Sequence, residues 1–256
     1  MSRFVTVTPN PALDLSTSVD QLVDAHKLRC DVPQVHPGGG GINVARVLHR
    51  LGAQVQALYP AGGATGERLH DLLRDEGVPD LRWAIAGESR ESLTVHERTS
   101  GREYRFVLPG PMLSGAEWRD GLNRLQHVSP PPAWVVSSGS LPQGVAADGH
   151  AQIARVAKAI GARMVVDSSG AALTAALAQG VWLVKPSLRE LAELTHEDLT
   201  TPRQQRQAAR QLIERGQAQM VALSLGPEGA MLVTADQCLH AAALSVPLRS
   251  TVGAGD

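Results

Sequence analysis

The sequence of 256 residues predicts an α/β fold, a three-layer sandwich with a small β-sheet lid. The main observation is that short apolar runs alternate with helical segments along most of the chain. Such alternation produces a mostly parallel sheet with helices on both faces. Two β-rich segments, at about residues 15–36 and 90–108, interrupt the alternation in the first half and are expected to form the lid.

The first half of the chain begins with a β-type run that ends in the turn sequence Pro9-Asn10-Pro11, which predicts a strand followed by a loop. Further along, apolar residues at i, i+3, i+4 and i+7 predict an amphipathic helix that begins in the glycine run of residues 38–41 and stops before Gly52. In order, the elements expected here are a strand at 4–8, a helix at 41–51, a strand at 54–59 and a helix at 65–76.

The second half repeats the alternation of strand and helix. Each apolar run is followed by a segment with helical periodicity. The expected strands lie at residues 134–138, 164–167, 182–185 and 220–224. The expected helices lie at residues 148–160, 171–178, 187–194 and 202–215.

The two lid segments have patterns of their own. Residues 15–36 mix β-branched, Ser, Thr and charged residues without a helical period, so they predict two or three half-exposed strands. Residues 92–97 and 103–108 flank Ser100-Gly101 and predict a β-hairpin. We expect them to form a small sheet inserted into a single domain that spans residues 1–256.

Composition excludes several classes of protein. With 24 Lys and Arg against 25 Asp and Glu, the net charge is -1, so no overall positive field exists to hold nucleic acid or an anionic membrane surface. Aromatic residues make up 3% of the chain, too few for a base-stacking surface. Cys30 and Cys238 show no metal-binding or disulfide spacing, and no signal peptide or apolar run of about 20 residues appears. We therefore expect a cytoplasmic protein.

Two glycine-rich segments are candidate anion sites. Gly38 to Gly41 open a helix, whose N-terminal N–H groups and dipole attract anions or sugar hydroxyls, although a glycine run by itself fits a flexible loop equally well. The second segment, residues 250–256, ends in Gly253-Ala254-Gly255-Asp256, where small residues could cradle phosphate charge and the Asp could accept a hydroxyl proton. The chain contains no GxxxxGK[ST] sequence, so neither segment is a P-loop.

Four basic residues in polar loops are candidate phosphate ligands: Lys27, Arg29, Arg90 and Lys185. Lys27 and Arg29 alternate with Leu28, which in a strand would place both charges on one face, where they could hold a phosphate. Taken singly, each of the four is more often a solvated surface charge.

The two glycine-rich segments, in this order within an α/β pattern, make the chain resemble the PfkB family of ribokinase-like carbohydrate kinases over nearly its whole length. The segment of residues 38–45 is similar to the first signature of the family and residues 250–256 to the start of the second. Three further motifs agree, at residues 138–142, 167–170 and 224–230. The resemblance implies a ribokinase-like, Rossmann-type three-layer sandwich. Within the family it is closest to the 6-phosphofructokinases, on residues 27–30, the four uninterrupted glycines and residues 60–66.

The resemblance implies an ATP- and Mg²⁺-dependent transfer of phosphate to fructose 6-phosphate, giving fructose 1,6-bisphosphate. Asp256 would be the catalytic base, and the N–H groups of Gly253, Ala254 and Gly255 the anion hole. The residues implied to hold the sugar are Asp14, Gly39, Gly40, Asn43 and Ser140, and those for its phosphate are Lys27, Arg29 and Arg90. The residues implied to bind the nucleotide are Lys185, Ser187, Ser224, Gly226 and Gly229, with Glu190 organising magnesium.

Two departures from the family qualify this expectation. Ser187 stands where the family usually has Asn, so contacts to magnesium or phosphate there are expected to be weaker or bridged by water. Family members also continue beyond the position of Asp256, so we expect the 256-residue chain to lack elements of the nucleotide pocket and to have little activity by itself.

Other functions remain open on the sequence. The alternative substrates are those of a 1-phosphofructokinase, a tagatose-6-phosphate kinase or a kinase of unphosphorylated sugars, and a less favoured alternative is a non-catalytic sugar-phosphate or nucleotide binding protein. In the resembling enzymes, lids of this kind pair across a dimer, so we also expect a homodimer formed through the β lid.

Overall fold

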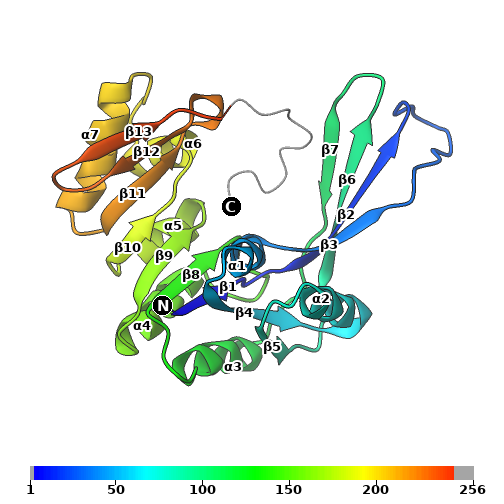
Figure 1. The fold of residues 1–256 in the computed structure, drawn as a ribbon, viewed down its shortest axis with the longest axis horizontal. Coiled ribbons are helices and arrows are strands. Elements are labelled where there is room, and N and C mark those ends of the chain that lie inside the picture. The colour runs from blue at the N-terminus through cyan, green and yellow to red at the C-terminus, as the bar shows by residue number, and fades with distance from the viewer. Residues whose placement is uncertain (1–2, 245–256) are drawn as a thin grey trace.

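The computed structural model describes residues 3–244 and contains two β-sheets (Figure 1). The larger sheet has nine strands in the order β13-β12-β11-β10-β9-β8-β1-β4-β5. Its strands up to β11 run parallel to their neighbours, and β12 and β13 are antiparallel additions at one edge. The strands of this sheet are β1 (Arg3–Val7), β4 (Gln54–Ala61), β5 (Asp80–Ala84), β8 (Trp134–Ser138), β9 (Arg163–Asp167), β10 (Val181–Val184), β11 (Ala218–Ser224), β12 (Ala230–Val233) and β13 (Cys238–Ala241).

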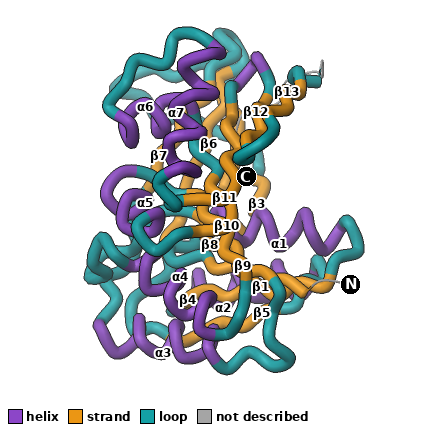
Figure 2. The backbone as a smooth tube through the Cα atoms, turned by 90° about the vertical axis from the view of Figure 1, so that its left-hand side faces the viewer, coloured by secondary structure: helices purple, strands orange, loops and turns teal. Residues whose placement is uncertain are grey.

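Helices cover both faces of the nine-stranded sheet, which confirms the predicted fold class. The apolar faces of α1 and α2 pack on β4 in one core cluster, whereas the other five helices pack in a larger cluster against the opposite face. Figure 2 shows the strands between α1 on one side and α4 and α5 on the other. The helices are α1 (Gly40–Arg50), α2 (Gly63–Asp75), α3 (Gly115–Gln126), α4 (Gly149–Ala159), α5 (Gly170–Leu177), α6 (Leu188–Thr195) and α7 (Pro202–Glu214).

The order of strands reverses beside β1. From β1 the sheet grows to β4 and β5 in one direction, and later to β8, β9, β10 and β11 in the other. In open α/β sheets, ligands bind outside the carboxyl ends of the strands at such a switch point. The edge where β1 and β8 end is therefore where a site is expected.

The smaller sheet has the order β3-β2-β6-β7 and projects from the main body as an arm (Figure 1). Its strands are β2 (Ala12–Val19), β3 (Gln34–Gly38), β6 (Arg90–Glu97) and β7 (Glu103–Val107). The chain enters this sheet first as β2 and β3, directly between β1 and α1, and again as β6 and β7, between β5 and α3, so the base of β2 and β3 lies at the switch point.

The structure differs from the sequence-based expectations in four places. The predicted strand pattern around Lys27 and Arg29 is wrong, because residues 20–33 form an irregular connection between β2 and β3 with a left-handed residue, Ala25, at φ 57°. Its return is fixed by the Asp31 N–H, which donates to the Ser18 carbonyl at 3.0 Å. The elements that the sequence pattern did not predict are β5, α3 and the edge pair of β12 and β13.

Within residues 3–244, no helix is both long enough and apolar enough to span a bilayer.

A partly buried ion pair joins α1 to the end of α2. The Arg46 guanidinium donates to Glu76 through Nε to Oε2 at 2.8 Å and through Nη2 to Oε1 at 2.6 Å. Its third nitrogen, Nη1, donates to the Pro37 carbonyl at 3.3 Å. The hydrogen bonds from Arg46 hold the pKa of the Glu76 carboxyl below its usual range, against the opposing effect of burial.

Replacing this carboxylate is expected to give a pH-dependent loss of stability. Glu76→Gln should lower the free energy of unfolding by about 1–2 kcal/mol at pH 7, because a two-point charged contact is lost. Since the folded-state pKa is depressed, the difference is fully present above pH 4.5 and disappears as the pH falls through the lower folded-state value. Urea unfolding across this pH range measures it. Asp71→Asn is the control, because the Asp71–Arg74 pair is more than half exposed and should contribute little. An equal effect of the control, or a difference independent of pH, would contradict the prediction.

Candidate active site at the carboxyl edge of the sheet

The glycine-rich start of α1 packs tightly against the end of β1. A side chain cannot replace the hydrogen at Gly39, which has φ 109°, because a Cβ atom there would lie 2.6 Å from Thr8 Cγ2. A Cβ at Gly41 would lie 2.5 Å from Thr8 Oγ1. The N-cap residue Gly39 has no side chain to satisfy the first N–H groups of the helix. This helix start is therefore suited to an anion or a sugar hydroxyl.

A second glycine turn, at the end of β8, meets the start of α1. A Cβ placed on Gly139 would have the Gly40 nitrogen as its nearest non-neighbouring atom, at 3.9 Å. The next residue, Ser140, is exposed, and its hydroxyl accepts a hydrogen bond from Asn10 Nδ2 at 3.1 Å. The structure thus brings the predicted residues Gly39, Gly40 and Ser140 to one place.

Asp14 and Arg90 lie at the base of the lid, next to this glycine turn. A Cβ on Gly38 would lie 2.0 Å from Asp14 Oδ2, so the carboxylate occupies the space above that glycine. The Arg90 guanidinium donates to the backbone carbonyls of Asn10 at 3.0 Å and of Pro11 and Leu108 at 3.4 Å each. Burial lowers the pKa of Arg90 and the charge of Asp14 raises it, and the first effect is larger. Arginine remains charged in this environment.

The predicted nucleotide residues lie along the same edge, farther toward β11. Lys185 follows β10, and its Nζ forms an ion pair with Asp167 Oδ1, at the end of β9, at 3.2 Å. The Ser224 N–H, at the end of β11, donates to the Pro186 carbonyl at 3.0 Å. The turn that follows β11 contains Gly226 and Gly229, at φ 59° and 100°.

Ser187 and Glu190 form a capping box at the start of α6. The Ser187 N–H donates to Glu190 Oε2 at 2.7 Å, and the Glu190 N–H donates to Ser187 Oγ at 3.3 Å. The Ser187 hydroxyl therefore serves the helix. A carboxylate has acceptor capacity on both oxygens, so the capping role of Glu190 is compatible with a further ligand.

Of the remaining predicted residues, Asn43 lies beside the start of α1, whereas Lys27 and Arg29 are not placed with these groups. Lys27 and Arg29 are exposed in the irregular connection between β2 and β3. Asn43 lies in the first turn of α1, where its N–H donates to the Gly39 carbonyl at 2.9 Å. The predicted catalytic residues lie outside the described residues, namely Gly253, Ala254, Gly255 and Asp256.

Sequence reasoning did not assign a role to two polar residues near the site. Asn10 follows β1 in the turn that the sequence identified as a loop, and it contacts both Ser140 and Arg90. His150 lies in α4 and contacts Gly139. The turn sequence around Asn10 was a usable signal, because polar residues directly after a parallel strand lie at the ligand-binding edge. His150 offered no comparable signal.

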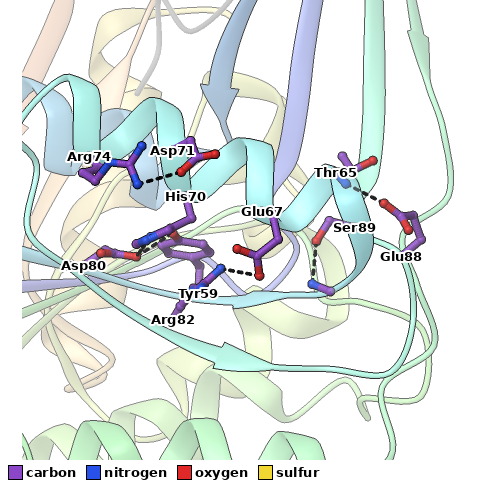
Figure 3. A network of polar contacts seen from close by, with 11 residues as sticks. Tyr59, Thr65, Glu67, His70, Asp71, Arg74, Asp80, Arg82, Glu88 and Ser89 are labelled. Carbon is purple, nitrogen blue, oxygen red and sulfur yellow. Dashed lines mark hydrogen bonds and ion pairs between the residues drawn. The ribbon is translucent and has the colours of Figure 1, made fainter.

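The start of α2, unlike that of α1, already holds a carboxylate (Figure 3). The Thr65 N–H donates to Glu88 Oε1 at 2.6 Å, and this backbone contact lowers the pKa of the Glu88 carboxyl. Behind the helix, Asp80 Oδ2 accepts from Tyr59 Oη at 2.6 Å and lies 3.0 Å from His70 Nδ1 (Figure 3). We conclude that the N-terminus of α2 is neutralised within the protein and is not a second anion site.

Comparison with known proteins agrees with this geometry. A model of the pfkB family of carbohydrate kinases matches residues 10–256. The ATP-dependent 6-phosphofructokinase isozyme 2 of Mycobacterium tuberculosis is 46% identical over 99% of this chain and 75% of its own length. The Escherichia coli isozyme 2 is 44% identical over 100% of this chain and 83% of its own length. A 1-phosphofructokinase of Xanthomonas campestris is 37% identical over 99% of this chain and 81% of its own length.

Solved structures show the same fold. The crystal structure of phosphofructokinase-2 from E. coli in complex with fructose-6-phosphate superposes with a TM-score of 0.92 at 43% identity, covering 100% of this chain and 84% of that one. The family match and these relatives confirm the resemblance inferred from the glycine-rich motifs. The chain belongs to the pfkB family of carbohydrate kinases, enzymes that transfer a phosphoryl group to an alcohol.

Proposed function

We propose that this protein transfers the γ-phosphoryl group of ATP to fructose 6-phosphate, forming fructose 1,6-bisphosphate and ADP. The observation that carries the proposal is the meeting of two glycine turns, at Gly40 and Gly139, beside Asp14 and Arg90 at the switch point of the sheet. The relatives named as 6-phosphofructokinases, at 44–46% identity, support the choice of sugar over the more distant 1-phosphofructokinases.

In this proposal the sugar lies between the base of the lid and the start of α1. The Asp14 carboxylate accepts hydrogen bonds from sugar hydroxyls, and the N–H groups of Gly39 and Gly40 and the Asn43 side chain add polar contacts. Ser140 borders the same space. The Arg90 guanidinium has five N–H donors, more than its three carbonyl contacts use, so donors remain for the sugar phosphate.

ATP binds along the edge formed by the ends of β9, β10 and β11. The Lys185 ammonium group supplies a positive charge at this edge and would neutralise nucleotide phosphates. The turn containing Gly226 and Gly229 lets the backbone approach the nucleotide closely. Ser224 and Ser187 lie at the same edge, where an isolated parallel bridge joins them.

Magnesium fits the donors at this edge. Glu190 and Asp167 supply hard carboxylate oxygens, and Mg²⁺ is usually held by one or two carboxylates together with substrate phosphates. Bound magnesium would neutralise charge on the nucleotide phosphates. Within the described residues, no group of three or more His, Cys, Asp or Glu side chains forms a metal site, which suits an ion brought in with the nucleotide.

The chemical step is assigned to the glycine-rich end of the chain, from the motif alone. Asp256 takes the proton from the sugar hydroxyl as its oxygen forms a bond to the γ-phosphorus, and the bond from that phosphorus to the bridging oxygen of ADP breaks. The N–H groups of Gly253, Ala254 and Gly255 stabilise the charge on the transferred group.

We further propose that the chain forms one kinase domain with an inserted lid, that it works in the cytoplasm, and that two copies pair through their lids. The lid exposes apolar side chains that a second copy would cover, namely Val32, Phe106, Val107 and Leu108. In such a dimer, Lys27 and Arg29, at the outer end of the lid, would contact the second copy of the chain. Sedimentation should show a dimer, and Phe106→Asp should convert it to monomers; a wild-type monomer would contradict lid pairing.

A substrate comparison tests the proposed function. On the natural full-length protein with MgATP as donor, we expect kcat/KM for fructose 6-phosphate to be well above kcat/KM for fructose 1-phosphate. The second candidate, a 1-phosphofructokinase, is favoured by the 37% identical relative and predicts the reverse ratio. Turnover of neither sugar would overturn the proposal and leave tagatose 6-phosphate and the binding-protein alternative to be measured.

A further inference from the structure

His150 is a fully buried histidine that touches the end of β8 with both ring nitrogens. It is the second residue of α4, and its side chain is shielded from solvent. Nδ1 lies 2.8 Å from Ser137 Oγ, and Nε2 lies 3.0 Å from the Gly139 carbonyl oxygen. No step of the proposed reaction uses this imidazole.

The two partners determine where its proton lies. A backbone carbonyl can only accept, so Nε2 carries the hydrogen and donates it to Gly139. Nδ1 is then the acceptor, and the Ser137 hydroxyl donates to it. Burial lowers the pKa of His150 to about 4, so the ring is neutral in the cell, and a single tautomer satisfies both contacts.

The Gly139 peptide is the point at which this histidine reaches the site. Its carbonyl also accepts from Ser168 Oγ at 3.2 Å, and its N–H donates to the Asp167 carbonyl at 3.0 Å. At φ 106°, Gly139 turns the chain from β8 toward Ser140, opposite the start of α1. The direction of the Gly139 carbonyl thus sets where Ser140 lies.

We propose that His150 is a positioning residue that holds the Gly139 turn at its spacing from the glycine-rich start of α1 and so shapes the sugar-phosphate site. The inference rests on the proposed function only in that this edge binds the sugar. It predicts that loss of the Nε2 donor weakens sugar binding while the nucleotide half, held by its own contacts, is little changed.

A matched pair of substitutions isolates the Nε2 contact. In His150→Gln the side-chain amide reaches the place of Nε2 and can donate to Gly139, whereas in His150→Asn the amide reaches only the place of Nδ1. We expect KM for the sugar phosphate to rise about tenfold in His150→Asn, as for one buried hydrogen bond. His150→Gln should restore it to within about threefold of wild type, and KM for ATP should change less than about twofold in both, below the cost of a hydrogen bond.

Two further measurements separate positioning from general stability and from the choice of sugar. Gln152→Ala, two residues further along α4, removes the hydrogen bond from Trp118 Nε1 at 2.9 Å and should lower Tm without changing KM. An unchanged KM in His150→Asn, or an equal rise in His150→Gln or Gln152→Ala, would overturn the proposal. Kinetics use the sugar phosphate that wild type prefers, so failure of the proposed function appears in wild type alone.

Nitrogen-15 NMR of the labelled histidines should show a neutral His150 ring with its proton on Nε2. A proton on Nδ1 overturns the inference whatever sugar is used.

Discussion

Replacing Gly38 with alanine is expected to lower kcat/KM for the sugar phosphate by about 100-fold, the cost of misplacing a substrate-positioning group by about 1 Å. The new methyl carbon would lie 2.0 Å from Asp14 Oδ2 and 2.3 Å from its Cγ. Because these atoms are the end of a short side chain, the carboxylate can swing away and the fold is kept. The substitution therefore removes Asp14 from the site without changing its charge.

The geometry of the lid base explains why only the carboxylate yields. Gly38 ends β3 and pairs with Ala12 of β2, while Asp14 pairs with the neighbouring His36. The backbone pairing holds both strands in place, so the conflict is relieved at the Asp14 side chain. The Tm of Gly38→Ala should accordingly stay close to that of wild type.

A double-mutant cycle tests this explanation. Gly38→Ala and Asp14→Ala should each lower kcat/KM, and the double variant should be no worse than Asp14→Ala alone, because the two act on the same group. Gly115→Ala is the control, since Gly115, at the start of α3, is not in the left-handed region and a Cβ there would meet only the end of the Arg119 side chain, at 3.3 Å. Full additivity in the double variant, or wild-type activity in Gly38→Ala, would refute the role of Asp14.

Replacing Lys185 with methionine is expected to raise KM for ATP by roughly 10- to 100-fold, as for one hydrogen bond to a charged group. Methionine keeps most of the aliphatic length of lysine and removes its charge. The KM for the sugar phosphate should change little, because Lys185 lies with β9 and β10 rather than with the lid. This pattern would separate the two halves of the carboxyl edge.

The control for Lys185 is a basic residue of the next helix. The Arg189 side chain is 80% exposed, and its ion pair with Glu193 in the same helix is long, at 3.7 Å. Arg189→Met should therefore leave both KM values unchanged. Steady-state kinetics with each substrate varied in turn give the four values. An unchanged KM for ATP in Lys185→Met, or a rise in the sugar KM of similar size, would contradict the assignment.

Much of the main sheet could be predicted because its strands and helices carry local signals. The helix at residues 40–50 shows its apolar spacing directly, and the strand at 134–138 was predicted with the observed bounds. Helix α3 was missed although Ser114 and Glu117 form a capping box at its start, a pattern that the sequence displays. Strands β12 and β13 are antiparallel additions at one edge of the sheet, so they lie outside the alternation of strand and helix on which the expectations rest.

The site was less predictable where tertiary contacts decide it. The composition of residues 15–36 predicted two or three strands, but residues 20–33 between β2 and β3 are irregular, held by contacts such as that of the Asp31 N–H with the Ser18 carbonyl, which no local pattern records. The contact of Asn10 with Ser140 joins residues 130 positions apart, and no local pattern records it. Motif resemblance did find the glycine turns, because their packing needs glycine at fixed places in the chain.

The lid consists of two insertions into the main body, β2 and β3 between β1 and α1 and β6 and β7 between β5 and α3, and this has a mechanical consequence. Each of its four connections to the main body is short, through residues 8–11, Gly39, residues 85–89 and residues 108–114. Two of these connections, residues 8–11 and Gly39, line the proposed sugar site, so a rotation of the lid as a rigid arm must move the backbone of that site. Docking of another molecule on the far end of the lid is therefore expected to be coupled to the fit of the sugar at its base.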